Sequence, residues 1–254
     1  MRIETIIFNP IYIEIPEYSL KRALKAYIES LVQGLNVFVI DVQKINSRYT
    51  LIELDGDDAE VVIRYLKRVF GCKLSHKDIK VGYEYSGRIK EISEVSLAID
   101  IGIEEQSYVE VNTLQLLSKI LRKKPDTLKP RVGRIMYLLG LTRYIPFVVK
   151  IVTAAKDRLR GIPGRRTLNM FRKWLNDRLD RVVVAGSLRA PLDKVLRKTK
   201  LYKSIIRVDR IGFLEHAVVC KFGIFADEVA EILRKNGFTR IATFMPRKLR
   251  KLVE

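Results

Sequence analysis

Two pairs of residues in this sequence have the types and spacing that could hold a metal ion. Cys72 and His76 lie four residues apart, and so do His216 and Cys220, which together look like two halves of a Cys2His2 zinc site. The second pair, however, belongs to the apolar, β-branched stretch HAVVC, which predicts a strand. Residues four apart on a strand are about 13 Å from one another. We therefore expect no metal site and no disulfide framework, and we expect the two histidines to be ordinary strand or loop residues.

Residues that could carry catalysis are equally sparse. Glu215 beside His216 is an acid–imidazole neighbour pair, but adjacent residues on a strand point to opposite faces. The sequence has no phosphate loop with Walker spacing, no HExxH and no Ser-centred elbow. The GIPG stretch at 161–164 could cradle a phosphate through backbone N–H groups, although a plain loop is the simpler interpretation. These observations favour a binding protein without a cofactor over an enzyme.

The basic side chains are concentrated in the second half of the chain. Of 48 Lys and Arg and 29 Asp and Glu, 34 basic and 11 acidic residues follow position 118, which gives that part a charge of about +23. The first 118 residues hold the other 14 basic and 18 acidic residues, a charge of about −4. A polybasic half beside a mildly acidic half is suited to holding a polyanion, and nucleic acid is the leading partner.

Neither a thermophilic surface nor a membrane accounts for this charge as well as nucleic acid does. Proteins of thermophiles carry many charged side chains without a partner, but their charges are normally balanced in sign. Anionic lipid is a rival polyanion, yet no apolar run approaches the roughly 20 residues that span a bilayer, and the N-terminus lacks a signal-peptide pattern. We expect a soluble, cytoplasmic protein that does not bind a membrane.

Residues 1–78 predict an α/β sandwich. An apolar strand around Ile6 to Ile15 precedes a helix, SLKRALKAYIESLVQGL, and the strands VFVIDVQKI and YTLIELDG precede a second helix, DAEVVIRYLKRVFG. This β-α-β-β-α order is one strand short of a ferredoxin-like unit, and residues near Lys73 to Lys80 could supply the last edge.

The pattern changes over residues 79–158. Gly82, Tyr85, Gly87 and Ile89, followed by AIDIG at 98–102 and YVEVNTL at 108–114, resemble the S1-type OB barrel. The resemblance implies that Tyr85, Ile89, Ile99 and Ile101 fill the barrel. It also implies a last strand at 146–158, after a basic helical insertion at about 111–144.

S1 domains usually bind RNA through an aromatic residue on the second strand and a histidine or other basic or aromatic residue on the third. Aligned with them, this chain has Ala98 and Glu110, and Glu104 and Glu105 lie nearby. The face should therefore be acidic and lack a stacking platform, which favours protein docking or spacing over RNA binding.

Residues 159–181 predict a basic linker and helix. Thr167 is the expected N-cap, and one side of the helix is an apolar stripe flanked by Trp174. The stripe consists of Leu168, Phe171, Leu175 and Leu179. The other side carries Arg165, Arg166, Arg172 and Lys173 with Asn169 and Asn176. A solvated outer face is the plain alternative, but four cations without an acid favour phosphate contact.

Residues 182–254 repeat the opening order as β-α-β-β-α-β, a complete ferredoxin-like unit followed by the basic tail RKLRKLVE. We expect an α+β protein with two such units around the barrel. The core residues expected in the last unit are Val182, Val184, Leu192, Val195, Ile206, Val218 and Ile232.

The segments RVVVAG and DRIGFLEHAVVCKFG resemble the hallmark of an archaeal family known as a domain of unknown function (number 2110). The pattern is most specific over Ile211 to Gly223, and VGY with AIDIGI in the middle also corresponds. The chain departs from the family pattern after Gly223, at Ile224, Phe225 and Glu228. The resemblance implies an archaeal cytosolic protein and supplies no activity.

The sequence thus favours an RNA-binding accessory protein, associated with the ribosome or ribosomal RNA in translation. A transcription-associated or DNA-binding protein is one alternative, and a scaffold whose acidic N-terminal half docks a basic partner, such as a ribosomal protein, is another. The cations expected to contact RNA phosphates are Arg122, Lys123, Lys124, Arg131, Arg165, Arg166, Arg172, Lys173, Arg197, Lys198, Lys200, Lys203, Arg247, Lys248, Arg250 and Lys251.

Overall fold

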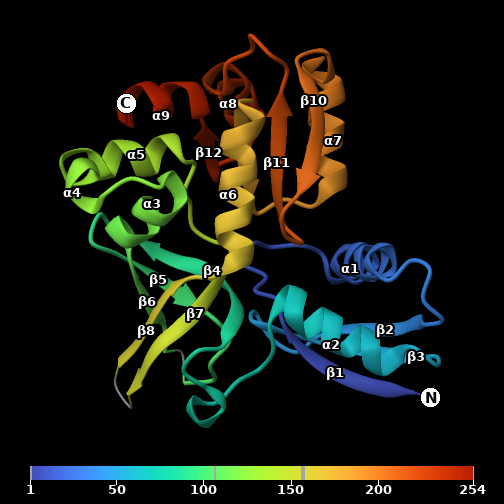
Figure 1. Cartoon of the computed structure of the whole chain (residues 1–254). Coiled ribbons are helices and arrows are strands. Elements are labelled where there is room, and N and C mark those ends of the chain that lie inside the picture. The colour runs from blue at the N-terminus through green and yellow to red at the C-terminus, as the bar shows by residue number, and fades with distance from the viewer. Residues whose placement is uncertain (1, 106, 156–157, 254) are drawn as a thin grey trace.

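The computed structural model describes residues 2–105, 107–155 and 158–253. Three sheets follow one another along the chain: a three-stranded sheet, a closed five-stranded barrel and a four-stranded sheet (Figure 1). Both open sheets are antiparallel, whereas the barrel is mixed. The protein is therefore α+β, with a central barrel flanked by two antiparallel sheets, as the sequence predicts at this level.

The N-terminal unit has the predicted β-α-β-β-α order. Its strands pair in the order β1-β3-β2, and helices α1 and α2 bury an apolar side against them. The apolar positions alternate along β3, so that Ile52 and Leu54 point into this core beside Leu24 and Leu66 of the helices. The elements are β1 (Ile3–Phe8), α1 (Glu17–Leu31), β2 (Phe38–Lys44), β3 (Tyr49–Asp55) and α2 (Ala59–Phe70).

Residues Lys73 to Lys80 do not supply a fourth strand to this sheet. Cys72 makes one isolated bridge to Ile7, and the chain then turns to the barrel, where the N–H of Leu74 donates to the Gly102 carbonyl at 2.9 Å. A short 3-10 helix, η1 (His76–Asp78), follows. The buried side chain of Leu74 joins the barrel core, which explains why the segment leaves the sheet.

The barrel closes in the order β4-β5-β6-β8-β7, with β6 and β8 parallel. Ile89, Ile99 and Ile101 are fully buried inside it, as predicted, whereas Tyr85 is half-buried. Gly87 permits the strands to coil tightly, because a Cβ there would lie 2.3 Å from the Asp100 carbonyl oxygen. The strands are β4 (Glu84–Ile92), β5 (Ser96–Asp100), β6 (Val109–Asn112), β7 (Pro146–Ala155) and β8 (Arg158–Pro163).

The single last strand predicted at 146–158 is two strands in the structure. β7 ends at Ala155, positions 156–157 lie outside the described residues, and β8 runs on to Pro163 through the stretch predicted as linker. GIPG is thus mostly strand, with Gly161 buried where a Cβ would lie 2.3 Å from a methyl group of Val149. Its Gly and Pro favour a loop in isolation, and close packing against β7 overrides that preference.

The insertion between β6 and β7 is helical, as predicted. It begins where the Asn112 side chain accepts the Gln115 N–H at 2.9 Å, which caps the first helix. Leu116, Leu117 and Ile120 bury one side of that helix in the core. The insertion contains α3 (Thr113–Leu121), α4 (Pro125–Leu128), η2 (Lys129–Arg131) and α5 (Val132–Leu138).

Helix α6 (Arg165–Asp177) differs from the prediction at both ends. It begins after Gly164, so Thr167 is inside the first turn, where its buried hydroxyl bonds to the backbone of Val148 at 2.7 Å instead of capping the helix. Arg178 adopts a left-handed conformation and ends the helix, which leaves Leu179 outside it. The buried side of α6 is therefore Thr167, Phe171 and Trp174, with Leu168 and Leu175 half-buried.

The C-terminal unit has the predicted β-α-β-β-α-β order, and its strands pair in the order β10-β11-β9-β12. Most of the expected core residues are buried or half-buried, but Ile206 is 50% exposed. A register shift between Ile205 and Arg207 turns its side chain outward. The elements are β9 (Arg181–Ala185), α7 (Arg189–Lys198), η3 (Leu201–Lys203), β10 (Ile205–Arg210), β11 (Glu215–Cys220), α8 (Ala226–Lys235), β12 (Ile241–Phe244) and α9 (Pro246–Val253).

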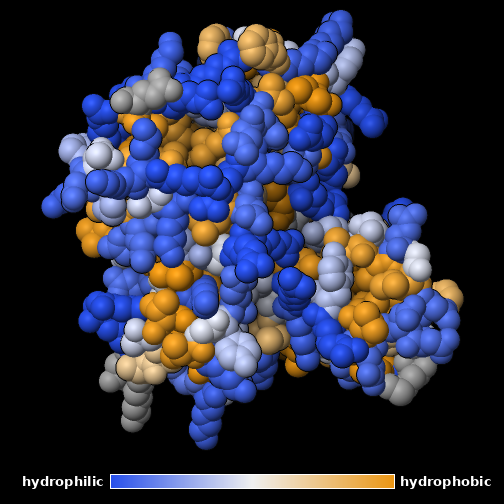
Figure 2. Space-filling model, viewed as in Figure 1, coloured by the Kyte–Doolittle hydropathy of each residue, from blue (hydrophilic) through white to orange (hydrophobic). Residues whose placement is uncertain are grey.

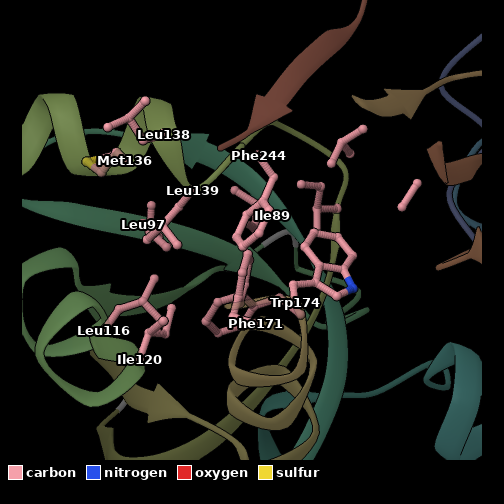
Figure 3. Close-up of a cluster of buried hydrophobic side chains, with 14 of the residues drawn as sticks. Ile89, Leu97, Leu116, Ile120, Met136, Leu138, Leu139, Phe171, Trp174 and Phe244 are labelled. Atoms are coloured by element: carbon pink, nitrogen blue, oxygen red, sulfur yellow. The ribbon is translucent and has the colours of Figure 1, made fainter. Parts of the chain in front are cut away.

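One continuous core joins the barrel, the helical insertion and the C-terminal unit. Figure 3 shows Phe171 and Trp174 of α6 among side chains from all three. The Trp174 ring meets Phe171 and Phe244 edge to face, at centroid distances of 5.7 and 5.3 Å. Because Trp174 is only 4% exposed, it packs in the core and is not free to stack on a base.

Within the described residues, no helix is both long and apolar enough to cross a bilayer.

Candidate nucleic-acid interface

The exposed side of α6 is a polar stripe with two cations. Arg165, Asn169, Lys173 and Asn176 are all exposed and recur at the spacing that places residues on one face of a helix. Figure 2 shows hydrophilic side chains covering this front side of the molecule over α6. At 1.5 Å per residue the helix is about 20 Å long, so the stripe extends from a groove at one end of α6 to a hollow at the other.

A basic groove lies at the N-terminal end of α6, between α2, the barrel and the helix. It has a volume of about 810 Å³. Glu84 is the acid among its lining residues, and its carboxylate accepts the Arg165 backbone N–H at 2.9 Å, so one of its oxygens caps the helix. The cations that line the groove are Lys67, Arg68, Lys150, Arg165 and Arg166, all exposed.

A second hollow, of about 340 Å³, lies beside the C-terminal half of α6. Among the described residues that line it there is no Asp or Glu, and apolar side chains such as Leu175 and Leu249 form part of it. The cations come from three separate stretches of the sequence: Arg122 and Lys123 after α3, Arg172 on α6, and Arg250 on α9. We call the groove, the stripe and this hollow together the α6 face.

Arg172 differs from the other cations of the α6 face. Its guanidinium donates to the carbonyl oxygen of Lys119 at 2.8 Å, and its Nε is buried without a partner among the described residues. The side chain is half-buried and ties α6 to α3. The prediction that Arg172 lies on the free basic side of the helix is therefore wrong, since it sits at the edge where the two helices meet.

The remaining predicted cations lie outside the groove and the hollow. Lys124 and Lys251 are exposed, and each follows a residue that lines the hollow. Arg131 donates to the carbonyl oxygen of Leu252. Lys248 forms an ion pair with Asp227 at 3.0 Å, and Arg247 lies over the ring of the exposed Phe222. A further group is exposed on α7 and the turn that follows it, Arg197, Lys198, Lys200 and Lys203.

Three cations of the groove were missed because they belong to other parts of the chain. Lys67 and Arg68 are in the last turn of α2, inside the half that is acidic overall, and Lys150 is on β7. The negative net charge of the first half of the chain hides the two cations on α2. The basic end of α2, a usual position for cations next to the helix dipole, was the available signal.

The barrel face predicted to be acidic is partly neutralised. Ala98 and Glu110 are directly paired on β5 and β6, as neighbouring positions of one sheet face. The Glu110 carboxylate lies 3.9 Å from the guanidinium of Arg158 and 3.7 Å from that of Arg160, both on β8. The strand missed in the sequence supplies these arginines, so the description of this face as acidic needs correction.

A buried carboxylate joins the three units. The Tyr12 hydroxyl donates to Glu215 at 2.6 Å, and Arg88 of the barrel lies 4.0 Å from the other carboxylate oxygen. Burial raises the pKa of Glu215 and the Arg88 charge opposes this. A Cβ at Gly212 would lie 1.8 Å from the same oxygen, so any larger residue there would displace the carboxylate. The segment GFLEH therefore has a structural role at the junction.

The histidines and cysteines have separate surroundings. His216 Nε2 bonds to the Ser187 carbonyl at 3.0 Å, and burial lowers the pKa of the ring to about 4. His76 Nε2 is 2.7 Å from the Ser107 hydroxyl. Burial raises the pKa of Cys220 to about 12, so its thiol is not a nucleophile at neutral pH. The described residues contain no group of three or more His, Cys, Asp or Glu arranged to hold a metal ion.

Residues 179–227 match the family model described as the DUF2110 C-terminal domain. The matched stretch covers β9 to the start of α8, and it confirms the resemblance seen in GFLEHAVVCKFG. A comparison with curated proteins finds no match. Among solved structures, the chain is similar to one described as "putative exosome complex RNA-binding protein", with 12% identity and a TM-score of 0.25, over 68% of this chain and 93% of that chain. That likeness is too weak to bear on function.

Proposed function

We propose that this chain, whose residues 179–227 match the DUF2110 C-terminal domain, is an RNA-binding accessory protein that holds phosphates along the α6 face. The observation that carries the proposal is the convergence of cations from α2, β7, α6, α9 and the turn after α3 on one side of the molecule. Among the described residues that line the groove and the hollow there is a single acid, and part of it is occupied in capping α6. Clustered cations of this kind bind the phosphate backbone.

We also propose specific folds for the C-terminal unit and the barrel. The strand order β10-β11-β9-β12 supports a ferredoxin-like unit, and a closed five-stranded barrel with a helical insertion after its third strand supports an S1-like OB barrel. Such modules are common in translation proteins, so we place the RNA on the ribosome by fold-level analogy. Phosphate contacts position a nucleic acid without reading its sequence, and we expect weak sequence preference.

The decisive experiment removes three free cations of the α6 face. A variant with Arg165, Arg166 and Lys173 changed to Gln should bind single-stranded RNA more weakly, with a slope of log K against log salt that is shallower by about 2, at about 0.7 per lost contact. Its stability should remain within about 0.5 kcal/mol of the parent, because these side chains are exposed.

The matched control removes the same charge away from the α6 face, by changing Arg22, Lys44 and Lys77, also exposed, to Gln. Equal losses in the two variants would mean that net charge, and not the α6 face, binds RNA. Competition between ribosomal RNA, duplex DNA and single strands at one salt concentration tests the nucleic-acid class. Co-sedimentation of the native protein with ribosomes through a salt gradient tests the ribosomal assignment.

A further inference from the structure

An exposed phenylalanine is displayed on a tight turn at one end of the C-terminal unit. The turn runs from Lys221 to Ile224 and is closed by the Ile224 N–H, which donates to the Lys221 carbonyl at 3.1 Å. Gly223 has a φ of +88°, which a type II turn requires at its third position. Phe222 stands at the corner with 80% of its surface exposed. The backbone of the turn therefore holds the ring out in water.

Cations and a second exposed aromatic residue lie near this turn. The guanidinium carbon of Arg247 lies 4.0 Å from the centroid of the Phe222 ring, over one of its faces. The Lys221 N–H donates to the Ser204 carbonyl at 2.9 Å, which brings the exposed Tyr202 and Lys203 into the neighbourhood. Figure 2 shows hydrophobic side chains among hydrophilic ones at this top end of the molecule, beyond β11 and α8.

The turn continues the α6 face. Asp180, three residues beyond the end of α6, accepts the Cys220 N–H at 2.9 Å and the Ala226 N–H at 3.2 Å, which anchors both ends of residues 221–225. Helix α9 links the same places, because Arg250 lines the hollow while Arg247, less than one helical turn earlier, covers Phe222. A strand of RNA that leaves the hollow along α9 reaches the ring.

We propose that Phe222 stacks on an unpaired base of an RNA strand held by the α6 face, so that the protein selects single-stranded over duplex RNA. The inference rests on the proposed function and specifies its substrate class. Arg247 occupies one face of the ring and leaves the other for a base, and an aromatic ring flanked by cations is the usual platform for single strands. A base inside a duplex offers no free face to such a ring.

The surrounding charge favours a nucleic acid over a protein as the occupant. Lys203, Lys221 and Arg247 are exposed near the ring. Of the two acids in the first turn of α8, Asp227 is paired with Lys248 at 3.0 Å and Glu228 is exposed, so cations still outnumber acids beside the turn. An apolar peptide would have to cover these cations without compensating them. A phosphate backbone compensates them and presents a base to the ring at the same time.

The test compares Phe222→Ala with Tyr18→Ala, a matched loss of an exposed ring, 75% exposed, from α1 of the N-terminal unit. The full-length proteins are titrated with a single-stranded RNA oligonucleotide and with a duplex RNA of the same length. Phe222→Ala should weaken single-strand binding about tenfold, the effect of one lost stack, and change duplex binding by less than about twofold. Tyr18→Ala should change neither.

A second variant, Phe222→Trp, should keep single-strand affinity, and the emission of the introduced exposed indole should be quenched on binding. Unchanged single-strand affinity in Phe222→Ala, or an equal loss for both RNAs, would overturn the stacking role and assign the ring to a protein partner or to support of Arg247. The proposed function would then still stand if the α6 variant loses binding. If the parent protein binds neither RNA, both proposals fail.

Discussion

The acid–imidazole pair of the sequence, Glu215 and His216, is buried and bonded to separate partners. His216 and Glu215 are adjacent on β11 and point to different neighbours, His216 to the Ser187 carbonyl and Glu215 to Tyr12 and Arg88. Both side chains are buried, so each affects stability through the cost of charging it in the core. This cost makes His216 a source of pH-dependent stability.

We predict that the protein loses stability as the pH falls from about 6.5 to about 4, in part because of His216. Burial holds the ring neutral in the folded state, with a pKa of about 4 against an ordinary value of 6.5, while the unfolded chain takes up the proton. The unfolded state therefore binds more protons in this range, and up to about 3 kcal/mol is lost. Glu215, whose pKa is raised, acts in the opposite direction.

The measurement is the free energy of unfolding in urea at pH 7.5 and 4.5, for the parent and for His216→Gln. The glutamine keeps a donor for the Ser187 carbonyl but does not titrate, so its stability should fall less between the two values. The same fall in both proteins would show that other groups cause the pH dependence.

For single residues, the sequence predicts exposed cations well and buried cations poorly. Most of the cations expected on the surface are there, because Lys and Arg are seldom buried. Arg181 is an exception: it is fully buried on β9, paired with Asp177 at 2.5 Å, and flanked by the rings of Trp174 and Phe244. Asp177 and Trp174 lie on α6 and Phe244 lies on β12, so the burial of Arg181 depends on how these elements pack and not on its local sequence.

Among the elements, helix α6 contacts the barrel, the insertion and the C-terminal sheet. Its amphipathic pattern is visible in the sequence, and its buried and exposed sides follow from it. The pattern does not show which residues, between the buried and the exposed side, contact another helix. Arg172 is such a residue, joined to the end of α3.

We predict that Arg172→Gln destabilises the protein by about 1–2 kcal/mol, whereas Lys173→Gln next to it changes stability by less than about 0.5 kcal/mol. Arg172 donates a charged hydrogen bond to the Lys119 carbonyl from a half-buried position, and Lys173 is exposed. Thermal or urea unfolding of the two variants checks this. Equal stabilities would mean that the contact between α3 and α6 contributes nothing measurable.

The periodicity of the sequence predicts the elements of the two outer sheets in order, because each strand and helix has its own apolar repeat. The strands of the barrel are harder to predict from the sequence. β8 contains RLRGIP, whose arginines, Gly and Pro resemble a loop, and it is a strand only because β6 and β7 pair with it on either side. Long-range pairing of this kind leaves little trace in local sequence.

On the scale of the whole molecule, the charge of +19 is arranged so that one side presents a cluster of cations with few acids. We predict a slope of log K against log salt of about −6 for single-stranded RNA, from about nine phosphate contacts at 0.7 each. The contributing cations are the exposed ones of the α6 face, Lys67, Arg68, Lys150, Arg165, Arg166, Lys173, Arg122, Lys123 and Arg250. Titrations at several salt concentrations give the slope, and a value shallower than about −2 would contradict the α6 face as the binding surface.

The shared carboxylate of Glu215 also constrains how this protein can evolve. Tyr12, Arg88 and Glu215 come from the N-terminal unit, the barrel and the C-terminal unit, and they meet at one buried point. Loss of Glu215 alone would leave a buried guanidinium without its anion, a cost of several kcal/mol. Lineages that replace one of these residues should therefore replace the others too, and correlated substitution at positions 12, 88 and 215 would record the docking of the three units.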